Sequence, residues 1–304
     1  MIRFVDTHRE RRSLDGLKWG VEPICEALQF APQTFYAARV RPPSDRLLRD
    51  ELLMPEILRV FEENYRVYGA PKIWRQLNRE GISVARCTIE RLMPVLGIRG
   101  VTRGRNPKTT DSSSGEVERP DDLLDRDFDA DAPNTKWVAD FTYVRTRSGM
   151  KYVAFIIDCY ARMIVGWWAS STMRTDLVLD ALEQAAWARG LGDGARPIHH
   201  SDAGSQYLSI SYTERLAEVG IEPSVGTVGD SYDNALAETI IGLYKTELVY
   251  NLGPFDGLDD LELATFEYVD WFNHRRLMGT TTPAEKEEHY HQQQTEIPKT
   301  RTLH

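Results

Sequence analysis

Apolar residues recur with different spacing on the two sides of residue 135. Beyond it, residues 137–146, 151–160 and 163–170 are rich in β-branched and aromatic side chains, and the first of these runs alternates with a period of two. Ser148 and Gly149 provide a turn between the first two runs. This pattern predicts a meander of three antiparallel strands.

Strand and helix signals alternate after the meander. Apolar side chains at helical spacing predict a helix over residues 176–188, which Gly190 ends. The remaining expected elements are a strand over residues 196–201, a helix over 212–219, a strand over 221–225 and, after a glycine-rich loop, a long helix over 235–249. This order is typical of an α/β fold with a mixed sheet and flanking helices.

Two pairs of short helices are predicted before residue 111. Residues 21–40 fit two short helices, a weak match to a helix-turn-helix. A clearer pair has one helix beginning at Pro71, a turn at Gly81 and a second helix from about Ala85. The polar positions of this pair include five basic residues, which are Lys72, Arg75, Arg79, Arg86 and Arg91.

Two interpretations of these basic residues stay open. A helix-turn-helix inserts its second helix into the major groove while basic side chains hold phosphates, which fits this charge pattern. An ordinary helical bundle with solvated arginines fits it as well. The basic tail at residues 99–108, with Arg103 and Arg105, either follows phosphates or is simply solvated.

Charge separates the two regions further. Residues 1–110 hold 20 basic and 13 acidic side chains, whereas residues 111–304 hold 17 and 33. A basic segment before an acidic one favours a nucleic-acid partner for the first. Three widely spaced cysteines predict neither disulfides nor a metal site, and no apolar run approaches the roughly 20 residues that span a bilayer. We therefore expect a cytoplasmic protein with no membrane contact.

Three acids in the predicted sheet region stand at positions that suggest a function. Asp140 lies inside an otherwise apolar strand, Asp202 follows a short strand, and Glu238 is one turn into the long helix. A carboxylate is costly to bury unless it is paired or holds a cation. Hard divalent cations bind a few carboxylate oxygens, and two such ions can assist both oxygens of a phosphodiester exchange. Taken singly, each acid is equally compatible with a surface position or a helix cap.

The spacing of these residues strengthens the inference that the acids act together. Thirty-five residues separate Asp202 from Glu238, and Lys245 follows Glu238 by seven residues, which places both on one helix face. Asn234 precedes Glu238 by four residues and shares that face, where it either contacts DNA or caps the helix.

The three acids stand in WVADFTYV, HHSDAGSQY and SYDNALAETIIGLYKTEL. This set resembles the DDE triad of insertion-sequence transposases of the two-reading-frame class, relatives of retroviral integrase with a ribonuclease H-like fold. VYGAPKIWRQL with ARCTIERLM resembles the helix-turn-helix that precedes the core in that family, and WFNHRRL with TPAE resembles its C-terminal segment. The resemblance covers about residues 55 to 285.

The resemblance implies the second-frame product of an insertion element, a DDE transposase subunit that binds element ends and performs DNA cleavage and strand transfer. The catalytic triad would hold two Mg²⁺ ions, with Mn²⁺ as a substitute, and Lys245 would hold DNA. Expected partners are double-stranded DNA at element ends and target, an upstream-frame helix-turn-helix protein or a fusion with it, and further copies of this chain on DNA. Such a protein would be associated with a bacterial-type nucleoid.

Composition, charge and the resemblance together suggest a division of the chain. We expect a helical segment with a candidate helix-turn-helix at residues 1–50, a helix-turn-helix DNA-binding domain with a basic tail at 51–110, an acidic linker at 111–134, a ribonuclease H-like catalytic core with a C-terminal helix at 135–285, and a polar, disordered tail at 286–304.

Some features depart from the family pattern. Ala203 replaces a polar residue after the second acid, and the segment at residues 278–284 is shorter than usual. From residue 135 onward, 15 basic side chains face 24 acidic ones, which is unusual for a DNA enzyme. Two alternatives are a catalytically silent DNA-binding regulator and a ribonuclease H-like nuclease. A regulator predicts a lost acid, and none is lost.

Overall fold

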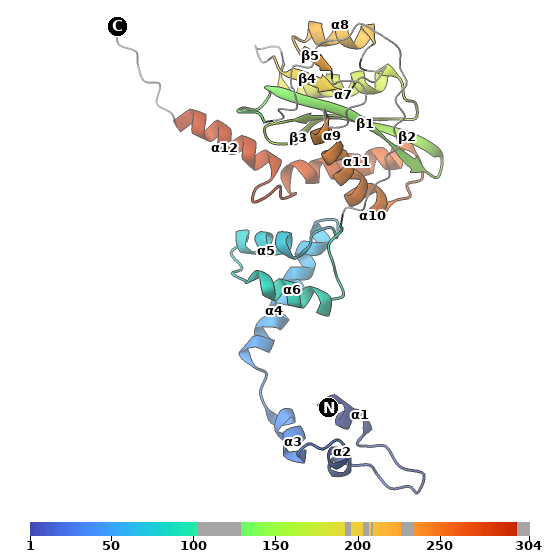
Figure 1. The fold of residues 1–304 in the computed structure, drawn as a ribbon, viewed down its shortest axis with the longest axis vertical. Helices are drawn as coiled ribbons and strands as arrows, with labels where there is room; N and C mark the ends of the chain where they lie inside the picture. Colours follow the sequence, from blue (N-terminus) through green and yellow to red (C-terminus); the bar gives the residue numbers. More distant parts are fainter. Residues whose placement is uncertain (103–128, 192–195, 203–206, 208, 226–233, 297–304) are drawn as a thin grey trace. The chain divides into compact units, whose positions relative to one another are not determined.

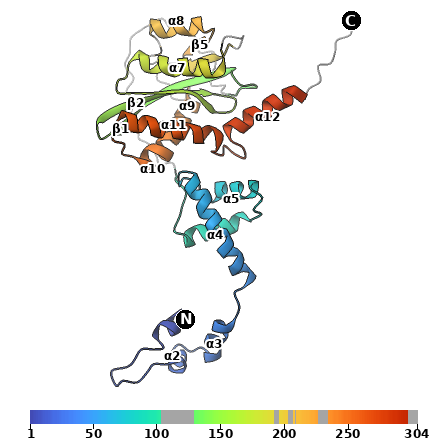
Figure 2. The same cartoon turned by 180° about the vertical axis from the view of Figure 1, so that it is seen from behind.

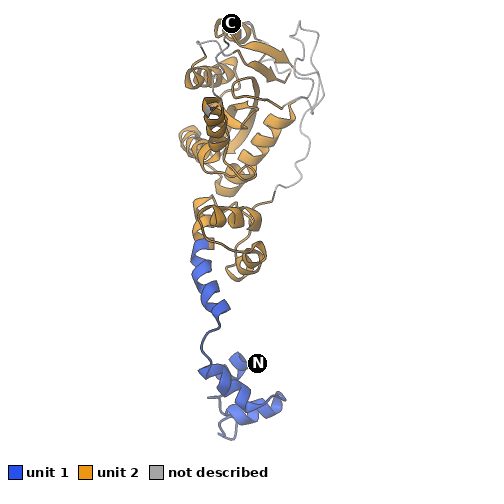
Figure 3. Cartoon of the chain, turned by 90° about the vertical axis from the view of Figure 1, so that its left-hand side faces the viewer, with its two compact units in different colours: residues 1–56 blue, residues 57–304 orange. Residues whose placement is uncertain are grey.

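The computed structural model describes residues 1–102, 129–191, 196–202, 207, 209–225 and 234–296. Contacts divide the chain into one unit at Met1–Glu56 and a second at Ile57–His304 (Figure 3). Within the described residues, no helix is both long and apolar enough to cross a bilayer.

The first unit is helical. Helices α1 (Ile2–His8), α2 (Val21–Ala27) and α3 (Pro32–Val40) share a small apolar core that includes Val5, Ile24 and Phe35. The two short helices predicted over residues 21–40 are confirmed. Helix α4 (Asp45–Glu63), which the sequence pattern did not predict, begins in this unit and ends in the next.

The second unit begins with the clearer helix pair. Helices α5 (Ala70–Arg79) and α6 (Arg86–Val95) pack through Ile73, Leu77 and Ile89, all fully buried. Gly81, with φ at +85°, makes the turn between them. The all-α region that the sequence predicts is therefore present.

The sheet follows in the order β3-β2-β1-β4-β5. Strands β1 (Lys136–Thr146), β2 (Gly149–Asp158) and β3 (Met163–Ser170) form the predicted antiparallel meander. Strand β4 (Ile198–Ser201) pairs parallel with β1, and β5 (Glu222–Val225) pairs parallel with β4. The predicted mixed α/β fold class is confirmed.

Helices cover both faces of this sheet (Figures 1 and 2). Helices α7 (Thr175–Arg189) and α8 (Ile210–Glu218) cover one face and bury a core that contains Trp137, Ala139 and Leu182. Gly166 allows α7 to pack directly on β3, because a Cβ there would lie 2.3 Å from the Ala181 carbonyl oxygen.

The opposite face carries the C-terminal helices. These are α9 (Ala235–Tyr244), the π-helix η1 (Lys245–Val249), α10 (Tyr250–Leu252), α11 (Leu258–His274) and α12 (Pro283–Glu296). The long helix predicted over residues 235–249 is helical throughout, but its last five residues widen into the π-helix. The Tyr244 ring packs against Phe155 of β2, with 4.9 Å between ring centroids.

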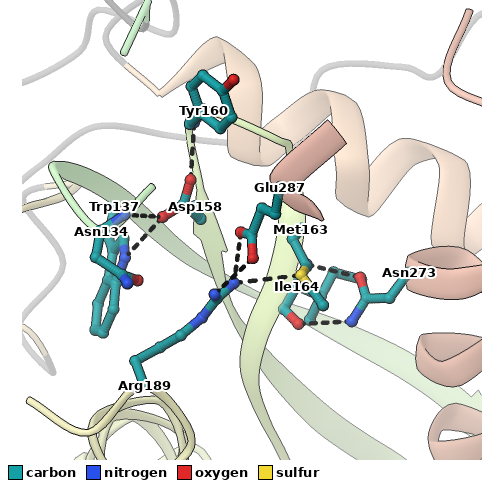
Figure 4. Close-up of polar contacts among 9 residues, drawn as sticks. All are labelled: Asn134, Trp137, Asp158, Tyr160, Met163, Ile164, Arg189, Asn273 and Glu287. Carbon is teal, nitrogen blue, oxygen red and sulfur yellow. Dashed lines mark hydrogen bonds and ion pairs between the residues drawn. The ribbon is translucent and has the colours of Figure 1, made fainter. Parts of the chain in front are cut away.

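Polar contacts fasten these helices to the sheet (Figure 4). Asn273 of α11 accepts from the Ile164 amide at 3.0 Å and donates to the Ile164 carbonyl at 2.8 Å, so it substitutes for a neighbouring strand. The fully buried Asp158 accepts from the Asn134 amide, the Trp137 indole and the Tyr160 amide. Asp158 therefore has a structural role, as its place outside the acid triad suggests.

The prediction of a disordered tail is wrong for residues 286–296, which form most of α12. Composition alone missed the contacts that hold this helix. Arg189 of α7 binds both Glu287 oxygens, at 2.7 and 2.8 Å, and Tyr290 stacks edge-on against Tyr160. Residues 297–304 lie outside the described residues, as does most of the predicted acidic linker.

The helix pair is joined to the C-terminal helices inside the second unit. Trp271 of α11 donates its indole hydrogen to Asn64 at 3.1 Å, and the Leu277 amide donates to the Tyr68 hydroxyl at 2.8 Å. Next to this contact, Arg276 forms a buried bidentate ion pair with Glu247 of η1, at 2.6 and 2.7 Å.

The buried ion pair yields a stability prediction. Glu247→Gln leaves the Arg276 charge without its partner in a site where both side chains are less than a tenth exposed, so we expect a loss of about 3–5 kcal/mol in the free energy of unfolding. The matched control is Asp256→Asn, since the Asp256–Arg147 pair is mostly exposed and should contribute about 1 kcal/mol or less. Equal losses in urea unfolding of the two variants would contradict this account.

Candidate active site

The first two acids meet where parallel strand pairing ends. The last residue pair between β1 and β4 is Ala139 with Ser201. The next residue on each strand is an acid, Asp140 on β1 and Asp202 after β4. Because parallel neighbours run in the same direction, the two carboxylates lie at the same edge of the sheet.

Glu238, the third acid, lies on the first turn of α9. Asn234 is the N-cap residue of this helix, and its buried side-chain amide donates to the Ala139 carbonyl at 2.9 Å. The Glu238 amide donates to the Asn234 carbonyl at 3.1 Å, which begins the helical hydrogen bonding. Asn234 therefore brings the start of α9 to β1 beside Asp140.

The charges of the other two acids both act on Asp140. Burial raises the pKa of Asp140 well above its ordinary value, and the negative charges of Asp202 and Glu238 raise it further. A hydrogen bond from the Phe141 amide at 2.8 Å and the charge of Lys245 oppose this rise only in part. The cluster thus has an excess of negative charge that a cation would relieve.

The chemistry of the cluster suits a hard divalent cation. Its donors are carboxylate oxygens from separate elements, the ligands that Mg²⁺ takes together with water and substrate phosphate. Among the described residues, no group of three or more His, Cys, Asp or Glu side chains is arranged so that it could hold a metal ion.

Lys245 lies at the start of η1. Its ammonium nitrogen lies 4.7 Å from the centroid of the Tyr143 ring on β1, in a cation–π contact. Tyr143 is three residues beyond Asp140 on the same strand and is nearly half exposed. The Lys245 ammonium is therefore held close to Asp140. The sequence analysis did not single out Tyr143, because a residue at an alternating position is typical of any strand.

Sequence reasoning also missed Tyr207. Its hydroxyl is buried and has no hydrogen-bond partner in the part of the chain that the structure describes. Burial raises the pKa of the phenol well above its ordinary value, and the charges of Asp140 and Asp202 add to the rise. The ring packs edge-on against Tyr212, with 5.5 Å between centroids. The available signal was its place five residues after Asp202.

Known proteins share this arrangement of segments. Family models describe residues 48–106 as an HTH-like domain, and residues 130–231 and 238–293 as an integrase core domain. The chain is 56% identical over 272 residues to a transposase assigned to insertion sequence element IS986/IS6110 in Mycobacterium tuberculosis, spanning 88% of this chain and 98% of the relative. It is 50% identical over 291 residues to the transposase of IS629 from Shigella sonnei, spanning 91% and 95%. The chain belongs to the insertion-sequence transposases.

The transposase also has likenesses among solved structures. The HTLV-2 integrase catalytic core domain in complex with magnesium matches 51% of this chain and 97% of its own length, with a TM-score of 0.42 and 20% identity. A simian T-cell lymphotropic virus intasome in complex with a PP2A regulatory subunit matches 77% of this chain and 74% of its own, with a TM-score of 0.45 and 16% identity.

Two histidines beside Asp202 are interior residues of the transposase fold. His199 lies 2.6 Å from the Tyr212 hydroxyl, and His200 lies 2.9 Å from the Ser224 hydroxyl. Burial lowers the pKa of His199 to about 3, so its ring is neutral. Each histidine therefore has a hydroxyl partner inside the core.

The basic residues of α5 point toward the transposase's own C-terminal segment. Arg75 donates to the Gly279 carbonyl at 3.1 Å. Arg79 donates to the Thr280 carbonyl at 2.6 Å and forms an ion pair with Glu285. The short segment at residues 278–284 is therefore where the helix pair contacts the C-terminal region.

The other predicted DNA contacts differ in their surroundings. Lys72 lies over the Tyr68 ring at 4.8 Å, and burial lowers its pKa to about 8. Arg86 of α6 is mostly exposed and pairs with Glu90 at 2.8 Å, and Arg91 is half-buried on the same helix. Three further residues of interest lie outside the described residues, namely Arg103, Arg105 and Ala203.

The raised pKa of Asp140 yields a pH prediction. A folded-state pKa above the unfolded value stabilises the fold at low pH, and that stability is lost as the pH rises through the folded pKa. Asp140→Asn should therefore flatten the dependence of Tm on pH above about pH 4. At pH 7 without metal it should raise Tm by about 2–4 °C, the shift expected for about 1 kcal/mol. Asp176→Asn, an exposed acid of α7, is the control. A lower Tm for Asp140→Asn at pH 7 would refute the predicted repulsion.

Proposed function

We propose that this transposase cleaves DNA at the ends of an insertion element and joins the freed strands to target DNA, with Mg²⁺ held by Asp140, Asp202 and Glu238. One observation carries the proposal. The charges of Asp202 and Glu238 both act on Asp140, which relates carboxylates from a strand interior, a strand end and a helix start. Asp140 is half-buried, whereas Asp202 and Glu238 are exposed. Like charges gathered in this way favour the binding of a cation.

Two bound Mg²⁺ ions would supply a nucleophilic oxygen and stabilise the oxygen that leaves the phosphodiester. Asp140, which interacts with both other acids, would contribute to both ion sites. Asp202 would complete the first and Glu238 the second. Lys245, held over Tyr143, would bind a phosphate of the element end beside the reacting strand.

DNA affinity has to come largely from elsewhere, because the region from residue 135 onward is net negative. We propose that the helix-turn-helix domain at residues 51–110 binds element ends through Arg86 and Arg91 of α6 and through Arg103 and Arg105. Lys72, Arg75 and Arg79 have intramolecular contacts that DNA would have to replace. An upstream-frame helix-turn-helix protein or a fusion with it, and further copies of this chain, would supply the remaining contacts at the nucleoid.

Cleavage of labelled DNA that carries the ends of the flanking element tests the proposal. Asp140→Asn, Asp202→Asn and Glu238→Gln each remove one ligand charge with little change in volume. Each should lower the cleavage rate in Mg²⁺ by at least about 10²-fold to 10³-fold, the scale for losing one group that stabilises transition-state charge. EDTA should abolish cleavage by the unaltered chain.

Asp176→Asn is the matched control, since it removes an exposed carboxylate on α7 outside the cluster. It should cleave at the unaltered rate. If DNA is bound but never cut, even when the upstream-frame protein is supplied, a regulatory role replaces the proposed one. If one triad variant keeps full activity, that residue is not a ligand.

A further inference from the structure

We propose that Asn234 is a positioning residue for the metal site, which it serves by clamping the helix that carries Glu238 to the strand that carries Asp140. The inference rests on the proposed function and assigns a role to a residue that does not itself contact the reacting atoms. It replaces two other roles for this position, a helix cap and a DNA contact.

The local geometry excludes a capping role for the side chain. Asn234 occupies the N-cap position of α9, where an asparagine commonly accepts a hydrogen bond from the helix backbone. Its side chain makes no such bond. The amide instead donates 2.9 Å across to the Ala139 carbonyl, 95 residues earlier in the chain. The side chain therefore links α9 to β1 and does not cap α9.

Burial argues against contact with DNA. Asn234 is 6% exposed, and its donor group is already engaged with β1. Its side-chain oxygen is buried and has no hydrogen-bond partner among the described residues. The amide satisfies a strand carbonyl while its oxygen has no partner within the described ranges, and an apolar residue would avoid that desolvation cost. This arrangement favours a positional role for the side chain.

Asn234 connects the backbone of all three acid-bearing elements. The carbonyl that it binds belongs to Ala139, the residue before Asp140. Ala139 pairs with Ser201, the residue before Asp202. The Asn234 carbonyl in turn accepts from the Glu238 amide. One side chain thus sets the position of the first turn of α9 against the strand pair that presents the other two carboxylates.

The clamp opposes a force that the site itself creates. Charge repulsion between Asp140 and Glu238 favours movement of Glu238 and the start of α9 away from the sheet. Without the clamp, more of the metal-binding energy would be needed to bring Glu238 back. The expected consequence is weaker metal binding, as found when groups that orient metal ligands are removed.

The chain contains a matched control for this inference. Asn273 of α11 also donates its side-chain amide to a strand carbonyl, that of Ile164 at 2.8 Å, and it is 5% exposed (Figure 4). It attaches a helix to β3, on the far side of β2 from the strand that carries Asp140. Asn273→Ala therefore removes a similar clamp away from the carboxylates.

The test compares Asn234→Ala, Asn234→Ser and Asn273→Ala in the full chain. Serine is a good N-cap residue but is too short to reach the Ala139 carbonyl, so it keeps the start of α9 and removes only the clamp. Three quantities are measured: the Mg²⁺ concentration for the half-maximal rise in Tm without DNA, the Mg²⁺ concentration for half-maximal cleavage, and the Kd for element-end DNA in Ca²⁺.

Both Asn234 variants should raise the two Mg²⁺ concentrations by about 10-fold to 100-fold and leave the Kd for DNA unchanged. Asn273→Ala should lower the starting Tm and leave both Mg²⁺ concentrations unchanged. Normal behaviour of Asn234→Ser would show a cap, and weaker DNA binding at an unchanged Mg²⁺ requirement would show a DNA contact. Either result overturns the inference. If the unaltered chain shows neither a Mg²⁺-induced Tm rise nor cleavage, the proposed function fails first, and the inference fails with it.

Discussion

Repulsion of Asp140 by Asp202 and Glu238 is the constraint on which the candidate site depends. The fold has to hold three like charges at one edge of a sheet, and it does so with backbone geometry. Parallel pairing of β1 with β4 places two acids on adjacent strand ends. The Asn234 amide then fixes the start of α9 to β1. The backbone therefore brings together the elements that carry the three acids, and the charge on Asp140's neighbours favours a cation there.

The C-terminal helices support this arrangement from outside. Asn273 joins α11 to β3, and the Arg276–Glu247 ion pair joins the chain after α11 to the π-helix that follows α9. Arg276 lies next in sequence to Leu277, whose amide binds Tyr68 ahead of the helix pair. The segment ahead of the helix pair and the π-helix that follows α9 are thus both held by the chain just after α11.

The strands of the meander were predictable from the sequence because their signals, alternation and β-branched residues, are local. The grouping of Asp140 with Asp202 and Glu238 rested on their spacing and on the family resemblance, because each acid taken singly is equally compatible with a surface position or a helix cap. Contacts between distant segments carry no such signal. Neither the attachment of Arg79 to Glu285 nor the helical α12, held by Arg189 and Glu287, follows from composition. The role of Asn234 could not be predicted for the same reason, because a residue that caps a helix and one that clamps the helix to a strand can stand at the same position in the sequence.

Divalent-ion binding tests the central claim most directly. Electron paramagnetic resonance of free Mn²⁺ counts the ions that the chain binds and shows whether Mg²⁺ displaces them. The account predicts binding of Mn²⁺ that Mg²⁺ competes away and that is lost when Asp140, Asp202 and Glu238 are all replaced by their amides. Equal Mn²⁺ binding by the unaltered chain and this triple variant would contradict it.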